Sequence, residues 1–494
     1  MSIRKLLILA SVASVSAVSA CKTSLFNAEV PAAPQPQVQA APVVVDGMRT
    51  SYADVVEKTS PAVVRIEADH KQKPSEQMQF PGGDDFFKQF RVPQQNQRPQ
   101  IEHGLGSGVV VQADGTILTN FHVVDGADKI TVAMSDNKTY SAKVVGSDQP
   151  SDLAVLKIEA SNLPFLTLGN SDTVRVGDIV LAIGNPLGIG QTVTAGIISA
   201  KGRRTGLSDG SFEDFLQTDA PINRGNSGGA LVNLNGELIG INSQILSGGS
   251  SGGNIGIAFS IPSNMAKSVM EQLLKDGKVH RGMLGVGIQT LTDDMVETFN
   301  AKDKAGVLVN SVKSGSSADK AGIKRDDIIT AVNGEKIDDT NVLRNKIAGT
   351  LPGTEVKVTV LRDGKELELT AELDEFDAGS TKKTGPGGDG DDNGAGPQDQ
   401  SGKLGLSLQP VTPQIAKQLG LDSGSGGMLV TEVDPNGPAA DAGIDRGDVI
   451  LEVNRSSVNS IADVKSALER AGDKPVLLLL SRKGQTIYLT VRPE

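Results

Sequence analysis

Aromatic side chains, cysteine and histidine are scarce in this sequence. Its 494 residues include no tryptophan, one cysteine and four histidines, and aromatic residues make up 3%. A lone cysteine excludes an intramolecular disulfide, and with only scattered histidines it leaves no Cys/His zinc site. Because 57 residues are glycine, the composition favours β-rich domains with many turns over a helical bundle.

Positive charge is also in deficit. The chain has 48 lysines and arginines against 59 aspartates and glutamates, which gives a formal net charge of −11 at pH 7. Proteins that bind nucleic acids carry basic patches that neutralise phosphates. We therefore expect no nucleic-acid partner.

One stretch imitates a metal site. Residues 389–394 read Asp-Gly-Asp-Asp-Asn-Gly, as at the start of an EF-hand calcium loop. The twelfth position of that loop, however, is Gln400 instead of glutamate, and the sequence predicts no amphipathic helix on either side. We expect no bound metal and no cofactor.

The N-terminus has the features of an export signal. Arg4 and Lys5 precede an apolar run, residues 6–20, which is too short to span a bilayer comfortably. Two interpretations of its end stay open: Val18-Ser19-Ala20 fits a signal-peptidase site, and the same residues followed by Cys21 resemble a bacterial lipobox. Either way we expect export. A lipidated Cys21 would tether the protein to a membrane, and the absence of a following aspartate favours the outer membrane.

Three short motifs place a histidine, an aspartate and a serine in contexts that suit nucleophilic catalysis. They are Thr119-Asn120-Phe121-His122, Ser151-Asp152-Leu153-Ala154 and Gly225-Asn226-Ser227-Gly228-Gly229. A serine hydroxyl is a poor nucleophile at neutral pH, so it needs a histidine to take its proton and a carboxylate to orient that histidine. The glycines would let the N–H groups of Gly225 and Ser227 converge as an oxyanion hole. The motifs predict hydrolysis of peptide bonds.

The order of the motifs separates two kinds of serine hydrolase. Gly225–Gly229 also fits the nucleophile elbow of α/β-hydrolases, whose triad runs Ser, Asp, His. The one histidine after Ser227 is His280, which lies in a charged run and is a poor candidate for a buried base. Before Ser227, His122 follows an apolar run that reads as a strand. The order His122, Asp152, Ser227 is that of chymotrypsin-like double β-barrels.

Periodicity supports the same fold class. Between residues 104 and 261 the sequence shows short β-type runs separated by turns and no convincing long helix, which predicts a pair of β-barrels. We expect a helix over 51–59 before them and, after them, an amphipathic helix that Ser263 caps and that stops near Gly277. The expected strands are 62–67, 108–111, 130–134, 153–158, 179–183, 196–200, 230–234, 238–242 and 257–261.

The remaining sequence contains an internal repeat. Residues 321–329, Ala-Gly-Ile-Lys-Arg-Asp-Asp-Ile-Ile, align with residues 442–450, Ala-Gly-Ile-Asp-Arg-Gly-Asp-Val-Ile, at an offset of 121. Asn333 and Asn454 keep the same offset. Two copies are too few for a solenoid, so we expect two tandem domains of one type. A Gly- and Asp-rich stretch between them reads as a flexible linker.

On these motifs the chain resembles the HtrA/Do-type (DegP/DegQ-like) serine proteases, and its two repeats look like the PDZ domains of that family. The resemblance implies a mainly β fold: a chymotrypsin-like double β-barrel protease domain followed by two PDZ domains, each a β-sandwich with helices. The implied segments are a signal peptide (1–20), a Pro/Ala/Gln-rich tether (21–50), the protease domain (51–277), the first PDZ domain (278–376), the linker (377–401) and the second PDZ domain (402–494).

The resemblance also implies site residues. His122, Asp152 and Ser227 would be base, orienter and nucleophile, and the backbone of Gly225, Asn226 and Ser227 would form the oxyanion hole. An apolar specificity pocket for small aliphatic residues would be lined by Ile222, Ile245 and Leu246, for which plain core packing is the alternative. Substrate C-termini would bind at Arg281, Met283, Leu284, Gly285 and Val286 in the first PDZ domain. In the second they would bind at Leu404, Gly405 and Leu406, whose loop is shorter and for which a role in assembly is the alternative.

The family's regulatory loop corresponds to residues 70–103 here, which carry Phe86, Phe87 and Phe90 in a polar setting. These rings would form an exposed apolar patch that binds other surfaces, or they would pack back onto the domain. The resemblance further implies an ATP-independent endopeptidase of the bacterial envelope that degrades unfolded or misfolded proteins, built of trimers or multiples of them. Two alternatives stay open: an envelope chaperone, and a stress-sensing protease with few clients.

Overall fold

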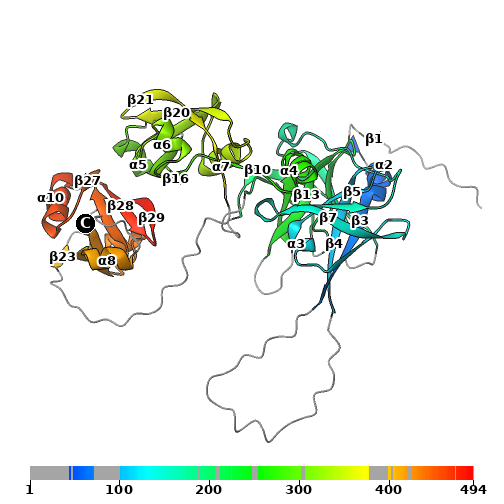
Figure 1. Ribbon diagram of the computed structural model, residues 1–494, viewed down its shortest axis with the longest axis horizontal. Helices are drawn as coiled ribbons and strands as arrows, with labels where there is room; N and C mark the ends of the chain where they lie inside the picture. Colours follow the sequence, from blue (N-terminus) through cyan, green and yellow to red (C-terminus); the bar gives the residue numbers. More distant parts are fainter. Residues whose placement is uncertain are drawn as a thin grey trace, which may run out of the picture. The chain divides into compact units, whose positions relative to one another are not determined.

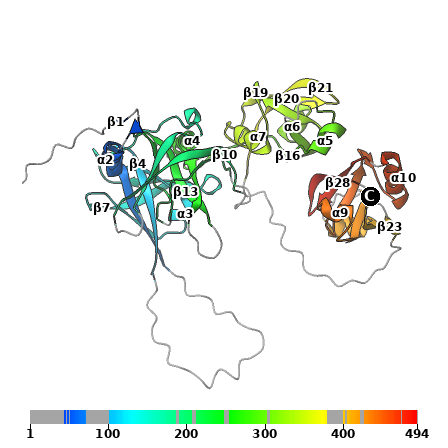
Figure 2. The same cartoon turned by 180° about the vertical axis from the view of Figure 1, so that it is seen from behind.

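The computed structural model describes most of the chain between residue 51 and residue 492 (Figures 1 and 2). The signal peptide, Cys21, most of the tether, residues 72–100 of the expected regulatory loop and most of the linker lie outside the described residues. The described residues are 44–45, 48–49, 51–71, 101–185, 190–205, 212–223, 225–247, 254–301, 306–377, 399–401, 404–419, 426–472 and 474–492.

Strand β1 (Val44–Val45) pairs with β2 (Met48–Arg49). Helix α2 (Ala53–Thr59) and a 3-10 turn, η1 (Ser60–Ala62), then lead into the barrels. In the part of the chain that is described, no helix is both long and apolar enough to cross a membrane.

Two closed β-barrels follow, so the expected mainly β fold is confirmed. The first has the strand order β3-β4-β5-β8-β7-β6. Its strands are β3 (Val63–Lys71), β4 (Ile101–Gln112), β5 (Thr116–Thr119), β6 (Lys129–Ala133), β7 (Thr139–Asp148) and β8 (Leu153–Ile158). The second has the order β10-β11-β14-β13-β12-β9. Its strands are β9 (Ile179–Gly184), β10 (Thr192–Arg203), β11 (Phe215–Thr218), β12 (Ala230–Asn233), β13 (Leu238–Ser247) and β14 (Asn254–Pro262).

Short helical turns connect the strands. They are α3 (Phe121–Val124), η3 (Gln149–Ser151) and η4 (Ser171–Thr173). Each expected strand falls within an observed one or overlaps it, because apolar runs such as β8 are buried on both faces. Strands β7 and β11 were missed. Most of β7 faces solvent and carries polar residues, so it lacks the hydrophobic run that marks a buried strand.

Helix α4 (Ser263–Asp276) closes the barrel pair by packing against β7, β8 and β13. The expected helix is present, but the expected cap is wrong. Pro262 is the N-cap residue, and the hydroxyl of Ser263, the first helical residue, donates to the carbonyl oxygen of Gly169 at 2.7 Å. The hydroxyl thus ties the start of the helix to the segment between β8 and β9 instead of satisfying the helix's own first turn.

The two repeats fold alike. In the first repeat the main sheet runs β16-β17-β18-β20-β21, with β19 beside β18. In the second it runs β23-β24-β25-β26-β28-β29, with β27 beside β26. Strand β18 begins at residue 328 and strand β26 at residue 449, so the two strands keep the offset of 121 residues found in the sequence. Each repeat has its own buried apolar cluster, which Leu284 joins in the first and Leu404 in the second.

The first repeat contains β15 (Gly282–Met283), β16 (Val286–Thr290), α5 (Asp293–Thr298), β17 (Val307–Val312), α6 (Ser317–Ala321), β18 (Ile328–Val332), β19 (Glu335–Lys336), α7 (Thr340–Ala348), β20 (Glu355–Arg362), β21 (Lys365–Glu372) and β22 (Asp374–Glu375). The second contains β23 (Asp399–Ser401), β24 (Leu406–Pro410), α8 (Pro413–Gln418), β25 (Met428–Val433), α9 (Pro438–Asp441), β26 (Val449–Val453), β27 (Ser456–Ser457), α10 (Ile461–Ala471), β28 (Val476–Arg482) and β29 (Gln485–Val491).

The sheets of the repeats differ at one edge. In the first repeat β16 is the edge strand of the described sheet and lies next to helix α7. In the second repeat the equivalent strand, β24, has an outer neighbour: residues 399–401 of the linker pair with it as β23 and contact helix α10. The corresponding edge therefore has no outer strand in the first repeat, where β16 contacts β29 of the second repeat instead, and is paired with β23 in the second.

Candidate active site

The first barrel brings His122 and Asp152 together. Strand β5 ends at Thr119, and the short helix α3 presents His122, while Asp152 follows the turn η3 and precedes β8. The imidazole Nδ1 lies 2.9 Å from both carboxylate oxygens of Asp152, and the backbone N–H of His122 donates to Oδ1 at 3.1 Å. An Nδ1–H held by a carboxylate leaves the Nε2 lone pair to accept a proton.

Asp152 adopts a left-handed backbone conformation, with φ 54° and ψ 41°. Such a conformation costs a non-glycine residue roughly 1 kcal/mol and persists when its surroundings hold it. Here the amide Nδ2 of Asn120 and the N–H of Phe121 both donate to the carbonyl oxygen of Asp152, at 3.0 and 3.1 Å. The motif around His122 thus also fixes the aspartate.

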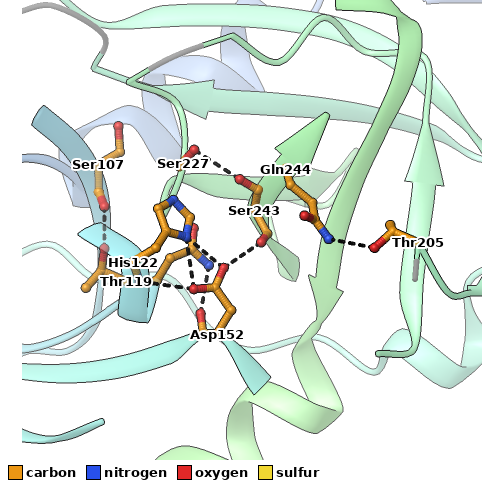
Figure 3. A network of polar contacts seen from close by, with 9 residues as sticks. Ser107, Thr119, His122, Asp152, Thr205, Ser227, Ser243 and Gln244 are labelled. Atoms are coloured by element: carbon orange, nitrogen blue, oxygen red, sulfur yellow. Dashed lines mark hydrogen bonds and ion pairs between the residues drawn. The ribbon is translucent and has the colours of Figure 1, made fainter. Parts of the chain in front are cut away.

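Ser243, a residue that the sequence reasoning missed, connects the two barrels at this site. Its hydroxyl donates to Oδ2 of Asp152 at 2.7 Å, and its carbonyl oxygen accepts the hydroxyl of Ser227 at 3.0 Å. Figure 3 shows His122, Asp152, Ser243 and Ser227 gathered in this network. In the part of the chain described, no hydrogen bond joins Ser227 to His122, so the hydroxyl must rotate toward the imidazole before it can lose its proton. Ser243 lies in β13 within no recognisable motif, which is why no sequence signal marked it.

The loop around Ser227 keeps two backbone N–H groups without an acceptor among the described residues: those of Gly225 and Ser227. The neighbouring N–H groups are engaged. That of Asn226 donates to the carbonyl oxygen of Asn223 at 3.0 Å, and that of Gly228 donates to Asn242 at 2.7 Å. Unpaired buried donors are uncommon in proteins and mark a place where a ligand atom can accept them. The geometry favours Gly225 and Ser227, without Asn226, as oxyanion-binding groups.

Gly228 explains why this loop needs glycine. Its φ is +81°, and a Cβ built there would lie 2.1 Å from the carbonyl oxygen of Ser107 and 2.4 Å from the hydroxyl of Thr119. Both are groups of the first barrel. The absence of a side chain thus lets the nucleophile loop of the second barrel lie directly against the first.

The residues expected to line the specificity pocket are only partly accessible. Ile222 is 1% exposed and belongs to the buried cluster of the second barrel, and Ile245 packs against that cluster while half-buried. Leu246 lies in β13, and its side chain is outside the described part. The structure therefore places Ile222 in the core, as the alternative interpretation had it, and leaves Ile245 at its border.

Arg281 does not project freely toward a peptide. Its guanidinium donates to both carboxylate oxygens of Asp148, at 2.8 and 2.5 Å, and lies 4.7 Å from the ring centroid of Phe212. Only 7% of the residue is exposed. Asp148 also accepts from the N–H of Ser151, the residue before Asp152. The ion pair therefore helps to hold the turn that carries Asp152.

The other expected peptide-binding residues of the first repeat border a cavity of about 660 Å³. Met283, Leu284, Gly285 and Val286 form one side, and Leu343 and Ile347 of α7 form another. Gly285 has a φ of +79°. In the second repeat Leu404 and Leu406 are buried in the core, and Gly405 has a φ of +69°. Each loop thus contains a glycine in the left-handed region.

The pKa of one carboxyl group, that of Asp214 just before β11, is raised. Burial, together with the neighbouring charge of Asp172, raises the pKa of Asp214 to about 6, although Lys201 opposes the shift. The folded state therefore holds this proton more tightly than the unfolded chain does. Because the folded pKa exceeds the unfolded value of 3.8, the contribution of this group to stability declines as pH rises from about 4 to about 6.

Two closed barrels, a carboxylate-held histidine on one and a serine in a glycine-rich loop of the other define a trypsin-like serine protease. Comparison with protein families agrees: residues 106–241 match the trypsin-like peptidase domain. Residues 282–373 and 429–482 each match a PDZ domain, so the expected repeats of PDZ type are confirmed.

Relatives match over most of the chain. The periplasmic pH-dependent serine endoprotease DegQ of Escherichia coli K12 is 42% identical over 450 residues, 90% of this chain and 91% of DegQ. A probable periplasmic DegP-like serine endoprotease of Chlamydia trachomatis serovar D is 40% identical over 460 residues, 90% of this chain and 88% of that protein. Among solved structures, the HtrA-type protease AlgW with a tripeptide is 42% identical, with a TM-score of 0.55 over 66% of this chain and 98% of that one.

The chain belongs to the HtrA/DegP family of serine endoproteases, as its motifs predicted. It is a serine endopeptidase with two PDZ domains. The names of its relatives also support an exported, periplasmic protein. Lipidation of Cys21 stays a prediction, since that residue lies outside the described part.

Proposed function

We propose that this protein is an ATP-independent endopeptidase of the bacterial cell envelope that degrades unfolded or misfolded proteins. The observation that carries the proposal is the arrangement of His122, Asp152 and Ser243 beside a serine whose loop keeps two N–H groups without an acceptor among the described residues. A protein that served only as a chaperone would have no use for this arrangement. Trimeric assembly and chaperone action are further parts of the proposal that rest on family resemblance alone. A lipid anchor is also part of it and rests on the lipobox-like residues 18–21.

The proposed reaction is acyl transfer. Ser227 turns from the carbonyl of Ser243 toward Nε2 of His122, gives up its proton and attacks the carbonyl carbon of the peptide bond. The N–H groups of Gly225 and Ser227 stabilise the oxyanion of the tetrahedral intermediate. His122 then protonates the leaving amine, and a water molecule hydrolyses the acyl-enzyme. Asp152 holds the imidazole throughout and stabilises its charge.

We further propose cleavage after small aliphatic residues. The expected pocket residue Ile245 presents an apolar side chain at the border of the barrel core, and Ile222 is buried behind it. A pocket of this kind offers neither a charge for a basic side chain nor, with Ile222 in the core, open depth for an aromatic ring.

A matched pair of substrates tests both parts. We expect the full chain to degrade a disulfide-containing protein that has been reduced and alkylated, and to leave the same protein intact when native. Mass spectrometry of the products should find valine or alanine before most cleaved bonds. Cleavage of native and unfolded forms at equal rates would contradict the quality-control role, and cuts after charged or aromatic residues would contradict the pocket. Suppressed aggregation without cleavage would favour the chaperone alternative.

We propose that the first PDZ domain takes the C-termini of substrates. Its edge strand β16 is unpaired in the described sheet, lies beside α7 and borders the cavity, so an extended peptide can add to it as a further strand. The equivalent edge of the second domain already carries β23, in the register Asp399↔Leu408, Gln400↔Ser407 and Ser401↔Leu406. The linker thus holds the position that a peptide would need, and the second domain is not a ready receptor.

Binding stoichiometry tests this division of roles. With Ser227→Ala to prevent cleavage, we expect one labelled peptide with a free apolar C-terminus to bind per chain, and its C-terminally amidated counterpart to bind far less. Replacing the linker strand by proline (Asp399→Pro, Gln400→Pro, Ser401→Pro) removes three backbone donors and should expose the second edge. The stoichiometry should then rise toward two. Two peptides per unmodified chain, or one in the proline variant, would count against self-occupancy.

A further inference from the structure

Ser107 lies behind the nucleophile loop, on strand β4 of the opposite barrel, and is fully buried. All of its polar groups are engaged. Its hydroxyl donates to the carbonyl oxygen of Gly225 at 2.6 Å and accepts the N–H of Asn185 at 2.8 Å. Its own N–H donates to the carbonyl oxygen of Ser227 at 2.8 Å, and its carbonyl oxygen accepts the hydroxyl of Thr119 at 2.7 Å. Figure 3 shows Ser107 beside Thr119.

These bonds act on particular peptide groups of the loop. The peptide between Gly225 and Asn226 is held at both ends, because its carbonyl oxygen accepts from Ser107 and its N–H donates to Asn223 at 3.0 Å. The peptide that follows Ser227 is held through its carbonyl oxygen, again by Ser107. The N–H groups of Gly225 and Ser227 belong to the peptide groups on either side of the first of these. Their directions therefore depend on how the held peptides are oriented.

The loop's own side chains do little to orient it beside these backbone bonds. Gly225, Gly228 and Gly229 have no side chains, and the side-chain oxygen of Asn226 is buried without a partner among the described residues. Glycine is the residue with the most backbone freedom, so a glycine-rich loop keeps one conformation only where its surroundings impose it. The hydroxyl of Ser107 can do so because a hydroxyl both donates and accepts.

We propose that Ser107 is a positioning residue for the oxyanion hole. Its hydroxyl sets the orientation of the Gly225–Asn226 peptide, so that the N–H groups of Gly225 and Ser227 point at one spot. The proposal rests on the proposed roles of those two N–H groups. Under this proposal the oxyanion hole also depends on a residue outside the nucleophile motif. Ser107 lies on the other barrel and precedes Ser227 by 120 positions (227 − 107).

Ser107→Ala in the full chain tests the proposal on a peptide substrate with valine before the scissile bond. Removing one donor from an oxyanion hole lowers kcat by about 10²–10³-fold, and misdirecting the donors should lower it by about 10–100-fold. We expect KM to change little, because the loss concerns the transition state. Ser107→Thr, which keeps the hydroxyl, should recover most of the rate.

Two inhibitors separate positioning from a general structural effect. A peptide ending in valinal forms a tetrahedral adduct with an oxyanion, whereas the peptide ending in valinol binds without one. In Ser107→Ala the inhibition constant of the aldehyde should rise as much as kcat/KM falls, while that of the alcohol stays unchanged. Equal weakening of both inhibitors would overturn the proposal, as would a kcat within about twofold of the unmodified chain.

Ser263→Ala serves as the matched control. Ser263 is 1% exposed, and its hydroxyl also donates to a backbone carbonyl of another segment, that of Gly169, away from the nucleophile loop. Ser263→Ala should keep its kcat. It should lose less stability than Ser107→Ala, because it leaves one backbone group without its partner and Ser107→Ala leaves two. Should Ser107→Ala fail to fold, Ser107→Cys, with a weak S–H donor of similar size, gives the same comparison. Inactivity of the unmodified chain would instead contradict the proposed function.

Discussion

Ser227→Ala should abolish proteolysis. The hydroxyl is the nucleophile of the proposed reaction, and removing the nucleophile of a catalytic triad lowers kcat by roughly 10⁵-fold or more, leaving the contribution of the oxyanion hole and of substrate binding. Cleavage of an unfolded protein, followed by gel and by mass spectrometry of the products, measures the loss. The variant should also escape labelling by a sulfonyl fluoride, which we expect to react with Ser227 of the unsubstituted chain.

The folded structure should survive this change. Ser227 loses one hydrogen bond, from its hydroxyl to the carbonyl oxygen of Ser243, and a bond of this kind contributes about 1 kcal/mol. Its backbone contact with Ser107 remains. Thermal unfolding should therefore change by a few degrees at most. Ser141→Ala, at an exposed serine of β7, is the control that should keep full activity. Proteolysis by Ser227→Ala at the rate of the unmodified chain would refute the assignment of the nucleophile.

Asp152→Asn should lower kcat by about 10³–10⁴-fold with little loss of stability. One oxygen of Asp152 accepts from the backbone and Nδ1 of His122, and the other lies between Nδ1 and the hydroxyl of Ser243. An amide has one acceptor atom and one donor group. Whichever way it is oriented, it either presents N–H to Nδ1, which favours the wrong tautomer, or gives up the bond from Ser243.

Kinetics and thermal unfolding together check this second prediction. We expect KM to change little, because His122 acts on the proton and not on substrate binding. Ser243→Ala removes one of the bonds to the carboxylate without altering its charge, and it should cost much less activity than Asp152→Asn. Full activity of Asp152→Asn would contradict the role of Asp152. Unfolding of the variant under assay conditions would contradict the expected small loss of stability.

The motifs predicted the proposed triad because catalysis demands particular side chains, and each of the three lies in a local pattern that the sequence shows. Apolar runs such as residues 153–158 form buried strands, and the two repeats, which are offset by 121 residues, fold alike. Strand β7 escaped notice because its polar face lies in solvent. The cap expected at Ser263 was wrong because its hydroxyl found a carbonyl in another segment, which no local pattern reveals.

The supporting residues were a different matter. Ser243 and Ser107 are ordinary serines in ordinary strands, and only the meeting of the two barrels gives them acceptors on Asp152 and Gly225. The sequence predicted that Arg281 binds the carboxylate of a peptide, but in the structure its guanidinium donates to Asp148. The linker gave no sign that residues 399–401 pair with the edge of the second repeat.

The sequence by itself determined the class of chemistry, the mainly β architecture and the two repeats, because these depend on residue type, spacing and hydrophobic period over short distances. Only the tertiary structure decided which groups hold the site together. Hydrogen bonds between residues far apart in the chain, such as Ser107 to Gly225, depend on where two barrels bring their backbones. That placement follows from the packing of the whole fold and leaves no mark on either residue's neighbours in the chain.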